Sequence, residues 1–243
     1  MKISHYQPRR ITRRTIDEAT LASFPTINDA IAYDPTPIPV EDVPHVAEKL
    51  ATTASTATQL YRIYALRRHP RWQVRVGEQG GFITPGVHID NGCWIDDDAA
   101  LCNSAQLYDE TYLGGRAVVA GAAGCQDHVY IDGDAFVHER TILKYMVRVK
   151  DNAEIRGDAV IDQYATLYGN CCIEGAPLIE GHARIGGNAH ITDNPHIFGR
   201  AHILGESICC GPMSVFGTAT LNPPTPTRFT QHFSSGTHIN NEP

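Results

Sequence analysis

The chain has 243 residues, with 20 Lys and Arg, 27 Asp and Glu, a formal charge of −7, and 42% hydrophobic residues. This acidic balance argues against a nucleic-acid-binding protein, whose signature is a basic patch on a basic domain. No run approaches the roughly 18 apolar residues of a membrane-spanning helix. The basic stretch 1–14 lacks the apolar segment of a secretory signal, which predicts a cytoplasmic protein.

Residues 1–58 are predicted to form an N-terminal extension. Prolines interrupt its first 40 residues, which predicts irregular chain there, at Pro8, Pro25, Pro35, Pro37 and Pro39. Residues 41–58 open with two acids and predict a short helix. Residues 59–82 are rich in aromatic and aliphatic side chains and predict an N-terminal cap for the part that follows, with 72–76 alternating like a strand.

From Ile83 to Leu221 an aliphatic or small apolar side chain recurs at every sixth position. Of these 24 positions, 22 hold Ile, Leu or Val, and the other two hold Cys125 and Cys209. The second position after each is Gly at 12 steps and Asn or Asp at 7 more. Gly, Asn and Asp tolerate the positive φ of tight turns, so the pattern indicates short strands joined by regular corners.

Such hexads predict an all-β chain wound as a parallel β-helix, because each short strand points one aliphatic side chain inward and its neighbours outward. Three hexads make one triangular coil of 18 residues, so residues 83–221 predict about eight coils and a rod roughly 38 Å long. The hexad with small corner residues is typical of the left-handed, hexapeptide-repeat form. Residues 222–243 predict either a C-terminal tail or a short cap.

The seven cysteines include two vicinal pairs and no C-x-x-C spacing. Neither a zinc knuckle nor a disulfide framework is indicated, so reduced thiols are expected. Histidines spaced by six, His190, His196 and His202, fall on three different faces of a triangular coil. Two stacked histidines need a separation near a multiple of 18, and His88 and His196 are six coils apart. We therefore expect no metal site. The nucleophile motif G-x-S-x-G is also absent.

One stretch of the predicted rod departs from the repeat, because no glycine occurs between Gly133 and Gly157. Four of the eight basic residues of 83–221 lie there with a tyrosine, and the group is Arg140, Lys144, Tyr145, Arg148 and Lys150. Grouped cations on an acidic rod predict an anion site, for example for a CoA phosphate. The alternative is a patch neutralised by neighbouring acids, namely Asp132, Asp134, Asp151 and Glu154.

Three segments resemble the beginning of the YdcK-type β-solenoid family, namely 63–67 (IYALR), 76–83 (VGEQGGFI) and 91–95 (NGCWI). The family has a similar aromatic and basic lead-in, a G-x-x-G-G-aromatic-Ile motif and a C-W-I coil, and the resemblance covers roughly residues 60–221. Its members are described as acyltransferase-like because of their fold, so the resemblance implies acetyl-CoA as the cofactor of any reaction.

Two outward faces of the early coils are apolar. Residues 18 apart stack, and the two faces carry Phe82, Ala100, Val118, Ala120 and Phe136, and Trp94, Tyr112 and Tyr130. A contiguous apolar surface indicates a partner. The 41–58 helix of the same chain is one candidate occupant. The other is a neighbouring rod in a closed homo-oligomer, and because related β-helices are commonly homotrimers, we favour a homotrimer through the Phe82–Phe136 face.

Two functions stay open from the sequence. The first, which we favour, is a non-catalytic scaffold for binding or assembly, which needs no cofactor and acts through a protein partner or its own copies. Acyltransferases of this fold place a histidine beside a long loop or a subunit cleft, whereas the register here is unbroken from 83 to 221. The second function is a CoA-dependent acyltransferase with its active site between subunits.

Overall fold

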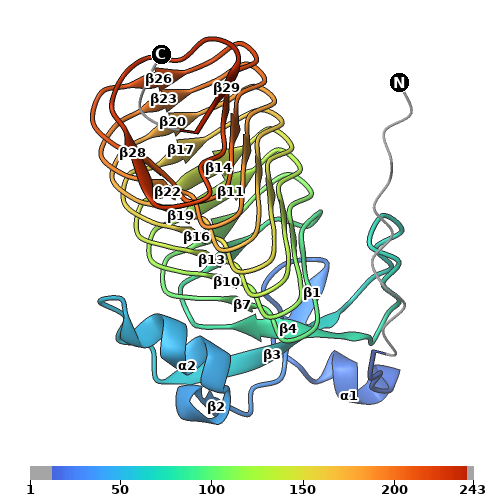
Figure 1. Cartoon of the computed structure of the whole chain (residues 1–243). Coiled ribbons are helices and arrows are strands. Elements are labelled where there is room, and N and C mark those ends of the chain that lie inside the picture. Colours follow the sequence, from blue (N-terminus) through green and yellow to red (C-terminus); the bar gives the residue numbers. More distant parts are fainter. Residues whose placement is uncertain (1–12, 240–243) are drawn as a thin grey trace.

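The computed structural model describes residues 13–239 and is a parallel β-solenoid with a small N-terminal unit. The N-terminal elements are α1 (Glu18–Ala22), β1 (Ile31–Tyr33), β2 (Ile38–Pro39), the 3-10 helix η1 (Val40–Asp42), α2 (Pro44–Ala51) and β3 (Gln59–Ala65). Figure 1 shows the coils stacked as a rod, which ends at β3 and β4, with α1 and α2 lying beside this end.

Three parallel sheets form the sides of the rod, and each coil contributes one short strand to each sheet, except that the last coil has none in the second. The first sheet contains β4 (Gln79–Ile83), β7 (Ala100–Leu101), β10 (Val118–Val119), β13 (Phe136–Val137), β16 (Glu154–Ile155), β19 (Cys172–Ile173), β22 (His190–Ile191), β25 (Ser207–Cys209) and β28 (Thr227–Phe229).

The second sheet contains β5 (His88–Ile89), β8 (Gln106–Leu107), β11 (Gly124–Gln126), β14 (Ile142–Lys144), β17 (Val160–Ile161), β20 (Leu178–Ile179), β23 (His196–Ile197) and β26 (Ser214–Val215). The third contains β6 (Trp94–Ile95), β9 (Tyr112–Leu113), β12 (Tyr130–Ile131), β15 (Arg148–Val149), β18 (Thr166–Leu167), β21 (Arg184–Ile185), β24 (His202–Ile203), β27 (Thr220–Leu221) and β29 (Thr237–His238).

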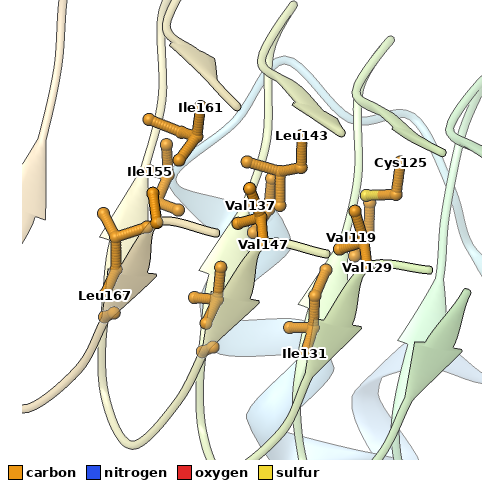
Figure 2. Close-up of a cluster of buried hydrophobic side chains, with 14 of the residues drawn as sticks. Val119, Cys125, Val129, Ile131, Val137, Leu143, Val147, Ile155, Ile161 and Leu167 are labelled. Carbon is orange, nitrogen blue, oxygen red and sulfur yellow. The ribbon is translucent and has the colours of Figure 1, made fainter. Parts of the chain in front are cut away.

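The six-residue repeat produces the predicted interior. Partner residues in neighbouring coils are 18 apart, as in the pair Val119 and Val137. The inward aliphatic residue of each hexad is buried, and Figure 2 shows these side chains stacked along the inside of the rod. All 12 glycines at the second position after an inward residue have positive φ. Glu139 and Tyr145 keep this left-handed conformation without being glycine, so the stretch lacking glycine retains the same corners.

The rod has about nine coils instead of the predicted eight, because the chain after Leu221 continues it. β28 pairs with β25 and β29 pairs with β27, while Phe229 and Phe233 are buried at this end. Residues 227–238 are therefore part of the solenoid. Of the two alternatives that the sequence left open, a tail or a short cap, this arrangement corresponds to the cap. The aromatic side chains close the apolar interior, which would otherwise meet water.

The N-terminal unit closes the other end with antiparallel pairing. β3 pairs with both β4 and β1, so the first coil has no open edge along this strand. The prediction of an irregular chain over residues 1–40 was wrong where the structure describes it, since 13–40 contain α1, β1 and β2. Asn28 fixes this segment because its side chain accepts hydrogen bonds from the backbone N–H groups of Ala30 and Ile31.

The predicted strand over 72–76 is instead a tight loop. His69 and Val74 exchange two backbone hydrogen bonds of 2.9 and 3.1 Å around a turn that starts at Pro70, and Gln73 has a φ of 54°. The loop brings Trp72 against Tyr112, with ring centroids 5.0 Å apart, and the ring of His69 against that of Trp94. These contacts bury Trp94 and Tyr112, so the chain itself covers the beginning of this aromatic face, while Tyr130 stays half-buried.

The predicted 41–58 helix is shorter in the structure, where α2 ends at Ala51. The hydroxyl groups of Thr52 and Thr53 donate to the carbonyl oxygens of Lys49 and Leu50, at 2.8 and 2.9 Å. Such hydroxyls compete with helical hydrogen bonds, and the following Thr- and Ser-rich segment has no helical periodicity of apolar residues. Residues 52–54 consequently form a turn, and residues 55–58 connect it to β3 without helical structure.

α2 lies on the first sheet and covers its apolar face. Val43 caps the start of the helix, and Val46 and Leu50 project from one side of it. All three are buried in a cluster with Phe82, Ala100, Cys102, Val118, Ala120 and Phe136. Polar contacts hold the helix in place, since His45 Nε2 lies 2.7 Å from the carbonyl oxygen of Asp98 and Lys49 donates to that of Arg116 at 2.9 Å. The occupant of this face in the structure is the chain's own helix, and the face is not open to a neighbouring rod while α2 is docked.

A buried polar network joins the N-terminal segment to the rod. Arg13 Nε donates to Asp96 Oδ1 at 2.7 Å, and the hydroxyl of Tyr112 donates to Asp96 Oδ2 at 3.0 Å. Asp97 lies beside it with a φ of 52°, and burial together with the charge of Asp96 raises the pKa of Asp97 from 3.8 to about 6. The folded state therefore binds a proton at Asp97 more tightly than the unfolded chain does.

We expect Asp97→Asn to stabilise the protein at pH 7.5 by on the order of 1 kcal/mol, because Asp97 is partly exposed and solvent screens the effect. The raised pKa means that Asp97 opposes folding fully above about pH 6, and this cost disappears as the pH falls from about 6 towards 4. Thermal unfolding at pH 7.5 and 4.5 checks this. An equal gain at both values would show that the charge of Asp97 is not the cause.

Among residues 13–239, the longest helix has 8 residues, and none has the length and apolar character needed to cross a membrane.

Candidate functional site

The residues of the predicted anion site lie around one coil and its corners, not on one surface. Lys144 ends β14 on the second sheet, whereas Arg148 begins β15 on the third. Arg140 makes two hydrogen bonds of 2.5 and 2.6 Å to the carboxylate of Asp158. Lys144 Nζ is 3.3 Å from Asp162 and 5.8 Å from the ring centre of Tyr145. The charges of Arg140 and Lys144 are thus directed to carboxylates of the next coil.

Lys150, the last member of that group, lies over the ring of Tyr130, with its ammonium 5.9 Å from the ring centre. Tyr130 also stacks on Tyr112, with ring planes only 8° apart. Lys150 therefore belongs to the aromatic column of the third sheet, and its position is set by contacts within the chain. A bound anion at the group stays a prediction.

Exposed apolar side chains gather on the second sheet. Ile142, Val160 and Leu178 point outward from β14, β17 and β20 in direct register, and we call them the second-sheet stripe. Ile142 is 43% exposed, Leu178 is 36% exposed, and Val160 between them is half-buried. On the first sheet, in contrast, the outward residues from Phe82 to Phe136 are at most 6% exposed beneath α2. The stripe is thus an apolar column that the described chain leaves in water.

The corner beside the stripe adds further exposed apolar surface. Tyr145, Met146 and Tyr164 are 51%, 37% and 53% exposed, and Met146 and Tyr164 occupy equivalent positions of consecutive coils. The pair Lys144–Asp162 lies between this corner and the stripe. The surface therefore combines apolar side chains with a polar margin, which is the composition of protein interfaces.

A second cluster, polar in character, lies on the first sheet where the cover of α2 ends. Glu154, Cys172 and His190 project outward from β16, β19 and β22 in direct register. Two residues further along the first two of these coils are Arg156 and Glu174. Arg156 Nε donates to Glu174 Oε2 at 3.1 Å, and its guanidinium also lies 3.5 Å from Glu154.

His138 joins this polar cluster to the apolar face. His138 is only 2% exposed and stacks on Phe136 with ring centroids 4.1 Å apart. Its Nε2 lies 3.3 Å from Glu154 Oε1. This hydrogen bond, together with the charge of Arg156, holds the pKa of Glu154 below its ordinary value. Glu154 is thus an ionised carboxylate at neutral pH.

Three donor groups of different chemistry converge in the polar cluster. The sulfur of Cys172, a carboxylate oxygen of Glu174 and a ring nitrogen of His190 all lie within 4.8 Å of one another. His190 Nε2 is buried, is 3.6 Å from Glu174 Oε1 and has no hydrogen-bond partner within residues 13–239. Burial and the charge of Glu154 raise the pKa of the Cys172 thiol to about 11. Cys172 is therefore a neutral thiol at pH 7 as long as no metal ion binds it.

This set escapes a sequence search that considers only pairs of histidines. Cys172 and His190 are 18 residues apart, which is the separation that stacks two outward side chains on adjacent coils. Glu174 follows Cys172 by two residues, so both point to the same side of the chain. A search for any Cys, His, Asp or Glu at separations of 2 and 18 would have found the three together.

A groove of about 620 Å³ lies between segment 53–59 and a corner of the first coils. Its walls consist mainly of Thr, Ser, Ala and Gly, and the charged side chain among them is Glu139. A shallower hollow of about 350 Å³ follows along the same corner and is lined by Glu139, Arg156, Gly157, Glu174, Gly175 and Asp193. The hollow gives solvent a path to the polar cluster.

All seven cysteines are free thiols, as expected from the sequence, and six of them are buried. Cys172 is the exception, being half-buried on the outer surface of β19. No protein-family model and no curated protein matches the chain.

Proposed function

We propose that the protein is a non-catalytic β-solenoid scaffold, of the hexapeptide-repeat type, whose working surface is the second-sheet stripe. The observation that carries this proposal is the apolar column of Ile142, Val160 and Leu178 on consecutive coils, exposed at both ends and flanked by an exposed Tyr and Met corner. Water-facing strand residues are ordinarily polar, so a stacked apolar column indicates a surface that is covered in the working protein.

The occupant we propose is another copy of the same chain, in a closed homotrimer. The Phe82–Phe136 face favoured from the sequence is not kept as the interface, because α2 buries that face within the chain. The second sheet is a rigid surface with a regular spacing between coils, and an identical rod presents the same spacing. Packing around a symmetry axis would bury the stripe of every copy without leaving an open face.

The rival function is the acyltransferase, and the charge of the groove is the feature that weighs against it. CoA carries several phosphate charges, and phosphate recognition needs cations or backbone N–H groups. The groove at residues 53–59 has Glu139 as its charged side chain, which would repel a phosphate. Arg140 and Lys144, two of the cations predicted to hold a phosphate, are already paired with Asp158 and Asp162.

Titration with acetyl-CoA separates the two functions. We expect no heat of binding in calorimetry and no change in melting temperature at millimolar acetyl-CoA. The melting temperature is informative because a ligand that binds only the folded state would stabilise it by mass action. A saturable heat at one site per chain, with a rise in melting temperature, would overturn the scaffold proposal. Lys144→Glu with Arg148→Glu would then show whether the cationic group holds the ligand.

A further inference from the structure

We propose that Cys172, Glu174 and His190 form a binding site for one zinc ion. Their sulfur, oxygen and nitrogen atoms come from neighbouring strands and lie within 4.8 Å of one another on a half-buried part of the first sheet. This inference concerns a surface other than the second-sheet stripe, so it does not depend on the scaffold proposal.

The geometry needs only a small closure to hold a metal. Zinc binds sulfur at about 2.3 Å and nitrogen or oxygen at about 2.0–2.2 Å, so tetrahedral ligand atoms lie roughly 3.3–3.8 Å apart. His190 Nε2 and Glu174 Oε1 are already 3.6 Å apart, and none of the three separations exceeds 4.8 Å. The closure needed is therefore at most about 1 Å, which rotation of the side chains can supply without moving the strands. The strands themselves are fixed by the ladder between β19 and β22.

The environment of His190 is the second observation that points to a ligand. Within residues 13–239 its Nε2 is buried and lacks a hydrogen-bond partner, although the side chain as a whole is 40% exposed and Nε2 faces the carboxylate of Glu174 at 3.6 Å. A buried ring nitrogen without a partner is unfavourable. A metal between His190, Glu174 and Cys172 would supply this missing interaction and would use the ring nitrogen as an electron-pair donor.

The donor set selects the class of metal. One thiolate, one imidazole and one carboxylate are ligands that zinc accepts together, whereas Mg²⁺ and Ca²⁺ prefer oxygen ligands alone. Three protein ligands leave a fourth position for water, and the hollow beside Arg156 and Glu174 gives access to it. An imidazole and a carboxylate without cysteine would not distinguish zinc so clearly from harder metals.

Charges around the site balance when zinc binds. The thiol of Cys172 loses its proton to solvent as the zinc–sulfur bond forms, so a thiolate and the Glu174 carboxylate neutralise the two charges of the ion. Arg156 holds Glu174 Oε2 at 3.1 Å and leaves Oε1 facing His190. Glu154 compensates the charge of Arg156, so these two side chains orient Glu174 without adding net charge.

Titration of the metal-depleted full-length protein tests the site. We expect zinc to bind with one ion per chain in calorimetry, and cobalt(II) in its place to give a thiolate-to-cobalt absorption band and visible bands of tetrahedral intensity. Cys172→Ser should remove the thiolate band, and His190→Gln should weaken zinc binding at least tenfold. His202→Gln is the matched control, since His202 is also an outward strand histidine but lies on the third sheet.

The wild-type chain provides a readout that does not depend on a variant folding. Zinc should protect Cys172 from alkylation by a small thiol reagent, as located by peptide mass mapping, because the sulfur is then a metal ligand. Alkylation of Cys172 at the same rate with and without zinc would overturn the proposal. So would a cobalt spectrum without a thiolate band, or zinc affinity that is unchanged in both Cys172→Ser and His190→Gln.

Discussion

Replacing Leu167 by alanine is expected to lower the free energy of unfolding by about 2–5 kcal/mol. Leu167 is the inward residue of β18, is fully buried, and stacks between Val149 of the preceding coil and Ile185 of the next. Removing its side chain leaves a cavity in a narrow interior, where backbone ladders on all sides keep the walls from collapsing. The loss therefore combines the transfer term with a cavity term.

Thr166→Ala is the matched control, because Thr166 precedes Leu167 on the same strand but points outward and is half-buried. We expect it to change the free energy of unfolding by no more than about 0.5 kcal/mol. Chemical denaturation of the two variants and the wild type measures the difference. Equal effects at the two positions would contradict the inward and outward assignment on which the whole repeat rests.

The second large effect is expected at the cover formed by α2. Val46 is fully buried between this helix and the first sheet, so Val46→Asp would place a carboxylate in an apolar contact. The helix must then leave the sheet or bury an unpaired charge, and we expect a loss of about 3 kcal/mol or more. Detachment would uncover the face from Phe82 to Phe136, so the variant should also bind a hydrophobic dye and self-associate.

Ala51→Asp is the control for Val46→Asp, because Ala51 lies on the same helix and is exposed. An aspartate there meets only the unfavourable end of the helix dipole, with an expected loss below about 1 kcal/mol. Denaturation and dye binding report both effects. A Val46→Asp protein as stable as the control, with no dye binding, would show that α2 does not cover the first sheet.

The coils could be predicted in detail because one local rule generates them. Every inward residue from Ile83 to Leu221 follows from a spacing of six, and the positive φ of most corners follows from Gly, Asn and Asp. The last coil was missed because its register changes. Cys209 pairs with Phe229 at a separation of 20, and Leu221 pairs with His238 at a separation of 17, so no fixed period extends across the prolines at 223–226.

The covers of the apolar faces were only partly predictable. The apolar residues of the Phe82–Phe136 face indicated that another element must cover it, and the 41–58 helix was one of two candidates. The choice depends on tertiary contacts, such as those of His45 and Lys49 with backbone carbonyls of the rod, which no local pattern records. For the same reason the alternating pattern of 72–76 predicts a strand, although two hydrogen bonds across residues 69–74 close the chain into a loop.

The surfaces of the candidate site were likewise predictable in their residue columns but not in their exposure. The stacking rule at a separation of 18 is enough to place Ile142, Val160 and Leu178 in one column, and also Cys172 with His190. What the rule does not give is which columns the chain covers, since that depends on where α2 and the 69–74 loop end. Exposure of the second-sheet stripe and burial of His190 Nε2 are therefore findings of the structure alone.

Sedimentation equilibrium at micromolar concentration is the most direct test of the scaffold proposal. The wild-type chain should have three times the chain mass of 26.6 kDa, and Ile142→Arg with Leu178→Arg should reduce this to one chain without loss of β structure. His88→Arg with Gln106→Arg, two exposed polar positions of the same sheet outside the stripe, should leave the trimer intact. A wild-type protein with the mass of a single chain, or a stripe variant that stays trimeric, would contradict the proposal.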